Sequence, residues 1–291
     1  MDQLPDLTDR VALVTGSSRG LGAAVARRLA TAGADVIVTY RRRTAEAEAV
    51  ADQVRAEGRR AWTHPVDLSE PNRIEALFEA VAAEPGGLDI LVANAAATSF
   101  VPLTEATVRQ IERTYAISVT GFLRSVQLAV PLMAGRGGGH VVAVSGADTR
   151  TYIPAHGILA GAKAALETTV HYLACELGDQ GITVTGINPG TIMGDSIRMM
   201  IGDELYAGAV EVEARSHPLR TAAGPDDIAD PVVLLCSDAA RWLNGAVVDA
   251  DGGGVFAMTG RWMAESAENA LARAGRSGEP GAAGPSVERL D

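Results

Sequence analysis

Short apolar runs alternate with alanine-rich amphipathic segments along most of the chain. The apolar runs predict strands over residues 11–14, 34–39, 60–65, 88–93, 140–145, 182–188 and 246–250. Apolar positions that recur every three to four residues predict helices over 44–57, 72–83, 105–133, 155–177 and 225–236. Such regular alternation is typical of an α/β fold in which a doubly wound parallel sheet carries helices on both faces. The carboxyl ends of its strands should line one crevice, where ligands bind.

Two stretches depart from this alternation. From Thr191 to Gly224 the periodicity weakens and Met, Gly and charged residues mix, which is typical of a mobile substrate lid. Beyond Arg261 an Ala/Glu stretch could form one helix, and Gly275 to Asp291 is rich in Gly, Pro and Ser and should be disordered. We therefore expect a single domain over residues 1–260, with a lid at about 191–224, and a partly disordered C-terminal extension over 261–291.

The first predicted strand leads directly into a glycine-rich turn, Thr15-Gly-Ser-Ser-Arg-Gly-Leu-Gly22, which a helical pattern follows. Such a turn leaves backbone N–H groups bare at the positive end of a helix, where a pyrophosphate can bind. An ordinary strand-to-helix turn is the alternative, but the strand and helix repeats downstream favour a Rossmann-like dinucleotide site. The turn residues expected to contact the cofactor are Gly16, Ser18, Arg19, Gly20, Leu21 and Gly22.

The second predicted strand delivers Tyr40-Arg-Arg-Arg43 to the place where an adenine ribose would lie. An acidic residue here would accept the ribose hydroxyls of NAD, whereas Arg suits the 2′-phosphate of NADP. With Arg41 and Arg42 at the strand end and Arg19 in the glycine turn, the sequence predicts NADP(H). Arg43 has a second interpretation, as the solvated start of the next helix.

The net charge of −11 over 291 residues argues against nucleic-acid and anionic-membrane partners, which both require a basic surface. No uninterrupted apolar run reaches membrane-spanning length, and the N-terminus lacks the features of a secretory signal, so we expect a cytoplasmic protein. Cys175 and Cys236 lie in apolar helical patterns without ligand-like spacing, which predicts buried, inert thiols and no metal.

Of the 25 basic residues, only Lys163 is a lysine. Arginine is permanently charged, whereas the pKa of lysine is tunable, so a site that needs such a group cannot accept arginine. Chance is the alternative explanation. The residues around Lys163 favour a functional role.

Several motifs together resemble the short-chain dehydrogenase/reductases over roughly residues 8–255. These are the glycine turn, Asn94-Ala-Ala96, Lys163 on its helix, Asn188-Pro-Gly190 and Asp251-Gly-Gly253. Within that family the chain is most similar to the NADPH-dependent enoyl-acyl-carrier-protein reductases of the third type, through Gly137-Gly-Gly-His-Val-Val, Lys163-Ala-Ala-Leu-Glu and Ser17-Ser-Arg19. The resemblance implies further cofactor contacts from Asp67, Leu68, Asn94, Ala95, Ala96, Lys163, Pro189, Gly190 and Ile192.

The resemblance also implies a small-molecule substrate, with a thioester or a carrier-protein-bound acyl group as one alternative. Family members pair their subunits through the two long helices, predicted here over 105–133 and 155–177. We therefore expect a homotetramer, or a homodimer.

The chain departs from the family at its catalytic positions. The family's Tyr, four residues before the Lys, is Leu159, and the position of its Ser is Gly146. Ser145 is adjacent, but an offset of one residue on a strand points a side chain to the opposite face. The helix-borne Asn of the proton relay corresponds to Ser118, and a Thr near the cofactor phosphates corresponds to Gly194.

Two residues could replace the missing phenol. Enoyl reductases of this fold have their Tyr seven residues before the Lys, where this chain has His156, and Tyr152 lies in the loop before the helix. A capping role for His156 and packing of Tyr152 beneath the lid are the alternatives. The candidate catalytic residues are therefore Lys163, His156, Tyr152, Ser145 and Ser118.

The leading hypothesis is reduction of a conjugated C=C bond by NADPH, with Lys163 on the nicotinamide ribose and His156 or Tyr152 stabilising the enolate. A second hypothesis is a dehydration, cyclisation or isomerisation that uses Asp148, Tyr152 and His156 as acid or base. A cofactor-binding pseudoenzyme is the third.

Overall fold

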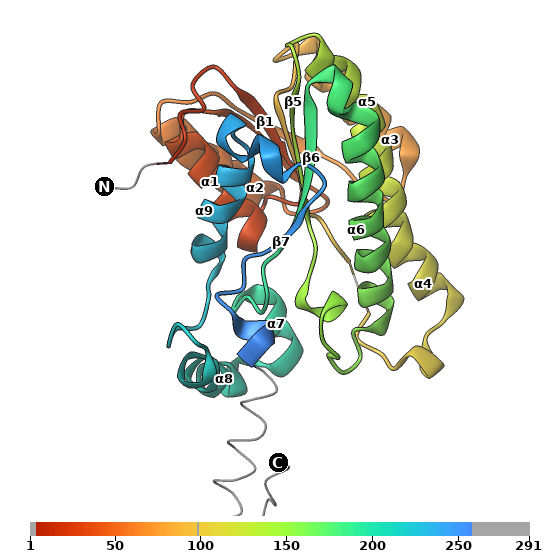
Figure 1. Ribbon diagram of the computed structural model, residues 1–291, viewed down its shortest axis with the longest axis vertical. Coiled ribbons are helices and arrows are strands. Elements are labelled where there is room, and N and C mark those ends of the chain that lie inside the picture. The colour runs from red at the N-terminus through yellow and green to blue at the C-terminus, as the bar shows by residue number, and fades with distance from the viewer. Residues whose placement is uncertain (1–3, 98, 258–291) are drawn as a thin grey trace, which may run out of the picture.

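The computed structural model describes residues 4–97 and 99–257, which form a seven-stranded parallel sheet with helices on both faces (Figure 1). The strand order is β3-β2-β1-β4-β5-β6-β7. The strands are β1 Val11–Val14, β2 Asp35–Tyr40, β3 Ala61–Pro65, β4 Ile90–Ala93, β5 Gly139–Val144, β6 Ile182–Asn188 and β7 Val247–Asp249. This confirms the predicted α/β class and doubly wound sheet, and each predicted strand is present to within about two residues.

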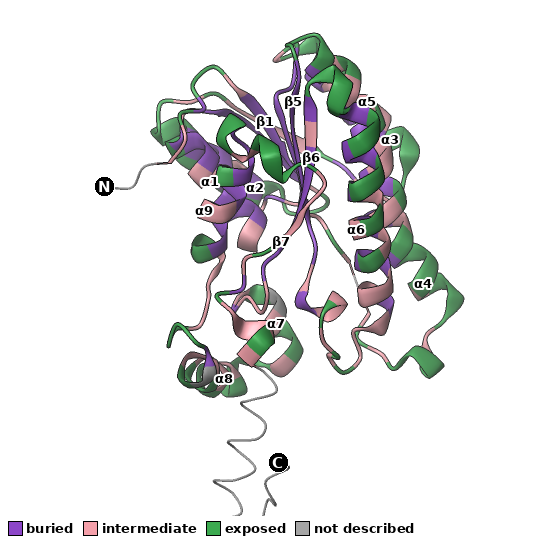
Figure 2. Cartoon of the chain, in the orientation of Figure 1, coloured by how far each residue is buried: buried purple, intermediate pink, exposed green. Residues whose placement is uncertain are grey.

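Two hydrophobic cores flank the sheet because successive residues of a strand point to opposite faces. Val14 and Val38 belong to one core, and Leu13 and Ile37 to the other. The first core is covered by α1 Gly20–Thr31, α2 Thr44–Ala56 and α9 Pro225–Leu235, and the second by α3 Pro71–Ala83, α5 Gly121–Ala134 and α6 Gly157–Leu177. Figure 2 shows buried strands between helices whose outer faces are exposed.

The helix predicted over 105–133 is interrupted. A 3-10 turn, η1 Leu103–Glu105, precedes α4 Val108–Tyr115, and a π-helical turn, η2 Ala116–Thr120, separates α4 from α5. Helix α4 begins at Val108 because Thr107 and Gln110 form a capping box that satisfies the first backbone N–H groups. The predicted start was therefore three residues too early.

The run Val108–Ala134 is long and apolar enough to cross a membrane by length and composition alone. Core helices of folded domains pass the same test. Here Phe122, Val126, Ala129 and Met133 are buried in the second core beside the sheet.

The predicted lid segment is largely helical, contrary to its weak periodicity. It forms α7 Asp195–Ile201 and α8 Asp203–Ser216, separated by Gly202 at a φ of +83°. Both helices lie beyond the lower edge of the sheet in Figure 1. Short helices with exposed faces need few apolar positions, so their periodicity is faint. The helix and disorder predicted beyond residue 261 lie outside the described residues.

The two cysteines differ in environment. Cys236, after α9, is buried as predicted, and burial raises the pKa of its thiol far above the usual range. Cys175 is exposed, so the prediction of a buried thiol there was wrong. Its helix, α6, covers the sheet with one face only, and Cys175 lies on the other.

Candidate active site

The glycine turn between β1 and α1 has the geometry of an anion site. Gly16 and Gly20 have φ values of +66° and +56°, which glycine adopts without a steric penalty. A Cβ on Gly22 would lie 2.6 Å from Nδ2 of Asn94, so a larger residue does not fit there. That Nδ2 donates to the carbonyl oxygen of Thr15 at 3.0 Å. Asn94, directly after β4, therefore holds the glycine turn in place through this hydrogen bond.

The first turn of α1 leaves its N–H groups open to a ligand. Arg19, the N-cap residue, makes no capping hydrogen bond through its side chain. A Cβ on Gly20 would meet no heavy atom within 4 Å. A hollow beside the turn is lined by Ser18, Arg19 and Gly20 together with residues of α2 and the start of α7. Bare N–H groups, open space and the positive end of a helix together fit a dinucleotide pyrophosphate.

Of the arginines predicted to contact the 2′-phosphate, Arg19 lines this hollow. Arg41 and Arg42 are exposed at the end of β2. Nε of Arg41 is 3.9 Å from Asp67, and Nη1 of Arg19 is 3.8 Å from Asp195 of α7. Arg43 pairs with Glu46 at 2.8 Å, which supports its second interpretation as a solvated helix start.

Asp67 and Leu68 lie after β3, where the resemblance places adenine contacts. Asp67 is not the N-cap residue of the following helix α3, which is Glu70. Oδ1 of Asp67 instead accepts hydrogen bonds from the backbone N–H and the hydroxyl of Ser69. Burial acts to raise the pKa of Asp67, but the Ser69 bonds and the charges of Arg113 and Arg41 hold it below the usual value.

The chain turns sharply after β6. Gly190 has a φ of +66°, and a Cβ there would lie 2.6 Å from Cβ of Asp251. Oδ1 of Asn188 accepts a hydrogen bond from the N–H of Gly190 at 3.2 Å. Its Nδ2 is buried without a hydrogen-bond partner in the described part of the chain. Pro189 is buried and Ile192 is partly buried at the same sheet edge.

Lys163 projects from α6 into the interior. Its Nζ donates to the carbonyl oxygen of Val144, at the end of β5, across 2.5 Å. Burial lowers the pKa of Lys163 to about 8, against the opposing charges of Asp148 and Glu167. The surroundings of Lys163 therefore shift its pKa towards neutral pH.

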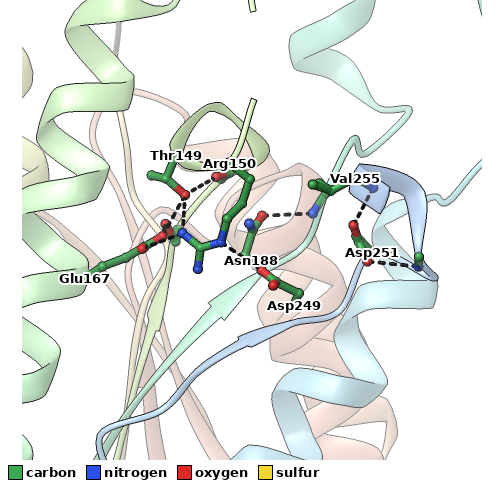
Figure 3. Close-up of polar contacts among 11 residues, drawn as sticks. Thr149, Arg150, Glu167, Asn188, Asp249, Asp251 and Val255 are labelled. Carbon is green, nitrogen blue, oxygen red and sulfur yellow. Dashed lines mark hydrogen bonds and ion pairs between the residues drawn. The ribbon is translucent and has the colours of Figure 1, made fainter. Parts of the chain in front are cut away.

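Ser145 joins a polar network that includes Glu167, which lies one helical turn from Lys163 on α6. Its hydroxyl donates to Oε1 of Glu167 at 2.5 Å, where Thr149 also donates at 2.8 Å. Arg150 binds Oε2 of Glu167 at 2.7 Å and lies 3.3 Å from Asp249 of β7 (Figure 3). Ser145 itself directly follows β5 and is buried. Its hydroxyl connects β5 to α6.

Gly146 leaves room for a carboxyl group. A Cβ on Gly146 would lie 2.7 Å from Oδ1 of Asp148, in the short turn η3 Ala147–Thr149. Burial raises the pKa of Asp148, while Lys163 and His156 oppose that rise. An acid therefore occupies the space that a side chain at position 146 would enter.

His156 is the N-cap residue of α6, because the helix begins at Gly157 rather than Ala155 as predicted. Its Nδ1 lies 3.0 Å from the carbonyl oxygen of Pro154, and its ring lies 4.9 Å from that of Phe100. A carbonyl oxygen only accepts hydrogen bonds, so Nδ1 carries a hydrogen. Nε2 is then a proton donor only in the cationic imidazolium.

Tyr152 and Ser118, the other two predicted catalytic residues, make no hydrogen bond to Lys163, Asp148 or His156 within the described residues. Tyr152 is 85% exposed, which contradicts the alternative of packing beneath the lid. Ser118 lies in the π-helical turn η2, and its buried hydroxyl has no hydrogen-bond partner among residues 4–97 and 99–257. It borders a small cavity with Thr15 and Leu166.

The sequence interpretation gave Asp148 a role only in non-redox chemistry and did not single out Glu167. Two sequence spacings could have indicated them: Asp148 lies two residues after Gly146, and Glu167 lies four residues after Lys163. A spacing of four residues places Glu167 one helical turn from Lys163.

Comparison with known proteins places the chain among reductases. The family described as Enoyl-(Acyl carrier protein) reductase matches residues 16–254. The 1-cyclohexenylcarbonyl-CoA reductase of Streptomyces collinus is 33% identical, over 84% of this chain and 86% of the relative. Versicolorin reductase 1 of Dothistroma septosporum is 33% identical, over 85% of this chain and 96% of the relative.

Solved structures of ketoreductases share the fold. LugOII, which catalyses keto-reduction at C1 during lugdunomycin biosynthesis, has a TM-score of 0.78 and 34% identity, covering 86% of this chain and 99% of its own. The landomycin C-6 ketoreductase LanV, with bound NADP and rabelomycin, has a TM-score of 0.75 and 32% identity, covering 87% and 98%.

Proposed function

The chain belongs to the short-chain dehydrogenase/reductase family, and we propose that it is an NADPH-dependent reductase of a carbon–carbon double bond conjugated to a carbonyl group. The family makes it an NAD(P)-dependent oxidoreductase that acts on a small molecule. We propose three further points: the cofactor is NADPH, the reduced bond is a C=C bond, and the residues named below have the roles given to them.

The residues around the glycine turn fit the cofactor. The N–H groups of α1 would hold the pyrophosphate, and Arg19, Arg41 and Arg42 would surround the 2′-phosphate. Asn188 has an unpaired buried amide that can donate to a ligand, and Lys163 would hold the nicotinamide ribose. The bound nicotinamide supplies the hydride.

One observation carries the choice of the C=C bond: the hydroxyl of Ser145 donates its hydrogen bond to Glu167. With Leu159 and Gly146 at the family's Tyr and Ser positions, the usual pair of hydroxyl donors for a ketone oxygen is replaced. Hydride addition to a conjugated C=C bond instead produces an enolate, whose oxygen needs a hydrogen-bond donor. His156 stands seven residues before Lys163, at the spacing of the Tyr in enoyl reductases.

The relative from Streptomyces collinus supports this substrate class, because its name describes reduction of an unsaturated acyl-CoA thioester. We therefore propose an enoyl thioester, carried on coenzyme A or on a carrier protein. The ketoreductases among the structural relatives make a ketone the competing substrate.

The decisive experiment incubates the purified chain with NADPH or NADH and with matched enoyl and keto thioesters, including 1-cyclohexenylcarbonyl-CoA, and follows nicotinamide absorbance. We expect oxidation with the enoyl substrates and tighter binding of NADPH than NADH by about 10–100-fold, because a charge-assisted contact contributes about 1.5–3 kcal/mol. Turnover of ketones alone would contradict the C=C assignment. Equal affinity for the two cofactors by calorimetry would contradict the NADPH assignment.

A second function is favoured by Asp148, an acid with a raised pKa beside Lys163. A carboxyl group with such a pKa suits dehydration, cyclisation or isomerisation, which need no hydride. Product formation without cofactor oxidation would identify this chemistry. Tight NADPH binding without any product would instead indicate a cofactor-binding pseudoenzyme.

A further inference from the structure

Asp148 holds a carboxyl oxygen that no other group satisfies. It lies in η3, directly after β5, and its Oδ1 is buried without a hydrogen-bond partner in the described ranges 4–97 and 99–257. A Cβ on Gly146 would lie 2.7 Å from this oxygen. The carboxyl group therefore fills the space that any side chain at position 146 would enter.

Three titratable side chains from the surrounding elements act on Asp148. Burial is the largest influence and raises the pKa of the carboxyl group. The charges of Lys163 on α6 and of His156 at its N-cap lower that pKa, and Glu167 on α6 raises it. The net pKa lies above the usual 3.8, so a larger share of Asp148 carries a proton near neutral pH than of an exposed aspartate.

The residues that follow Asp148 anchor its turn. Thr149 donates to Oε1 of Glu167 at 2.8 Å, and Arg150 donates to Oε2 at 2.7 Å. Arg150 also reaches Asp249 on β7, at 3.3 Å. These contacts, visible in Figure 3, fix η3 between α6 and β7 while Oδ1 of Asp148 stays unpaired. An acid on a fixed turn, with a free oxygen, is preorganised for proton transfer.

We propose that Asp148 is a catalytic acid of this site and gives its proton to the carbonyl oxygen of the substrate. The inference rests on the proposed reduction of a conjugated C=C bond. Bound NADPH would supply a hydride to the β-carbon, and the π electrons of the C=C bond would shift towards the carbonyl oxygen to give the enolate. The O–H bond of Asp148 breaks as the enol O–H bond forms, and the Asp148 carboxylate regains a proton from water.

The enol then becomes the saturated carbonyl compound when a proton is lost from oxygen and gained at the α-carbon. One NADPH is oxidised for each double bond reduced. His156 keeps its role in holding the substrate oxygen, and Lys163 lies close enough to stabilise the carboxylate that Asp148 leaves.

The first test compares the parent with Asp148→Asn, which keeps the shape of the side chain and cannot give a carboxylic proton. We expect kcat with the enoyl substrate to fall about 10²–10⁴-fold, the usual contribution of general acid catalysis, while the Kd for NADPH stays within about twofold. Asp179→Asn, an exposed change of the same kind in the turn after α6, is the matched control and should keep the parent's kcat.

The pH profile separates a chemical role from a structural one. In the parent, kcat should fall as pH rises through the raised pKa of Asp148, because the acid form is required. In Asp148→Asn this fall should disappear and leave a low rate. A ¹³C NMR titration of aspartate carboxyl carbons in the cofactor-free protein should show one resonance that titrates at a higher pH than that of an exposed aspartate. This resonance should be absent from Asp148→Asn.

Gly146→Ala tests the position of the carboxyl group without removing the acid. The added methyl group would lie 2.7 Å from Oδ1 and displace it, and a misplacement of about 1 Å can cost about 10²-fold in rate. We expect a similar loss of kcat with unchanged NADPH affinity. The backbone of Gly146 is extended, at a φ of −166°, so alanine adds no strain of its own.

The outcomes distinguish this inference from the function on which it rests. A parent that reduces only ketones, with Asp148→Asn inactive, would overturn the C=C assignment and support the acid. A parent that reduces enoyl thioesters, with Asp148→Asn equally active or with an unchanged pH profile, would overturn the acid and support the C=C assignment.

Discussion

The ammonium group of Lys163 donates a hydrogen bond to the carbonyl oxygen of Val144 across 2.5 Å, in a position where the lysine is only 4% exposed. A single main-chain oxygen does not replace the hydration that a free ammonium group has in water. The lowered pKa of Lys163 follows from this burial. This lowered pKa has a measurable consequence for stability. Lys163 is the only lysine in the chain, so no other lysine contributes to the pH dependence.

We expect Lys163→Met to change how the free energy of unfolding depends on pH. Between pH 8 and 10.5 the unfolded chain binds a proton on Lys163 that the folded chain has lost, so the parent gains stability as pH rises through this window. The gain is about 3 kcal/mol. The advantage of the Met variant over the parent should therefore be largest below pH 8 and shrink towards pH 10.5.

Denaturant titrations of both proteins across that window measure the difference. Cys236 and the tyrosines are common to both chains, so their contributions cancel. Stability curves that run parallel over the whole window would show that Lys163 titrates as an exposed lysine does.

His156→Ala should lower turnover of an enoyl substrate about 10²–10⁴-fold, with NADPH affinity nearly unchanged. His156 would contact the substrate and not the cofactor, whereas Lys163→Ala should lower both turnover and affinity. Leu159→Tyr should not rescue the His156 variant, because the substrate oxygen would lie one helical turn away. Steady-state kinetics and calorimetry separate the two quantities.

His171→Ala, on the exposed face of the same helix, is the control and should behave as the parent. If His156→Ala turns over normally, the histidine is a structural N-cap residue. Tyr152 then becomes the next candidate for the enolate contact.

Gly22→Ala should disrupt the cofactor turn. The new Cβ would lie 2.6 Å from Nδ2 of Asn94 and 2.6 Å from the carbonyl oxygen of Gly16, and overpacking of this kind costs about 1–3 kcal/mol. We expect lower thermal stability and weaker NADPH binding. Gly208→Ala in α8, with open space around its Cβ, should instead leave binding unchanged and stabilise the protein slightly. Gly22→Ala with the parent's NADPH affinity would argue against this turn as the pyrophosphate site.

Ser145→Ala should destabilise the protein and leave turnover within a few-fold of the parent. The hydroxyl donates to Glu167, and a hydrogen bond of this kind contributes about 1–3 kcal/mol. Burial acts to raise the pKa of Glu167, but bonds from Arg150, Ser145 and Thr149 hold it below the usual value. Such a carboxylate stabilises the fold above its unfolded pKa, and this stabilisation is lost as pH falls through the folded pKa.

The cost of Ser145→Ala should accordingly be largest near neutral pH and fade in acid. Chemical denaturation over the acid range measures it. A large loss of kcat with unchanged stability would restore Ser145 as a catalytic residue.

The apolar side chains exposed on α4 and α6 should bury in a homotetramer or homodimer. Val108 on α4 and Tyr172 on α6 are each 68% exposed, and Leu103, in the turn η1 before α4, is 62% exposed. Light scattering at micromolar concentration should show an oligomer, and Val108→Glu should weaken it by placing a charge in the interface. Leu205→Glu on α8, an equally exposed position on another element, is the control. A monomeric parent would contradict the prediction.

The sequence by itself determined the succession of strands and helices along the chain and the position of the glycine turn. Both are local properties: an apolar run of four to seven residues predicts a buried strand, and glycines at fixed spacing predict a turn that only they can adopt. The sequence also placed Ser145 and Gly146 at the carboxyl end of the fifth predicted strand, but both lie beyond β5, where strand alternation no longer sets the direction of a side chain. The weak periodicity of 191–224 did not indicate the helices α7 and α8, because short, exposed helices bury few side chains.

Only the tertiary structure decided which groups meet at Lys163. Asp148 approaches because η3 folds back against Gly146, and Ser145 is occupied because Glu167 reaches it from α6. Local periodicity carries no information about these approaches, which depend on how β5, α6 and β7 pack. The pKa of Lys163 is likewise set by burial between elements distant in sequence, because the cost of removing a charge from water depends on everything that surrounds it.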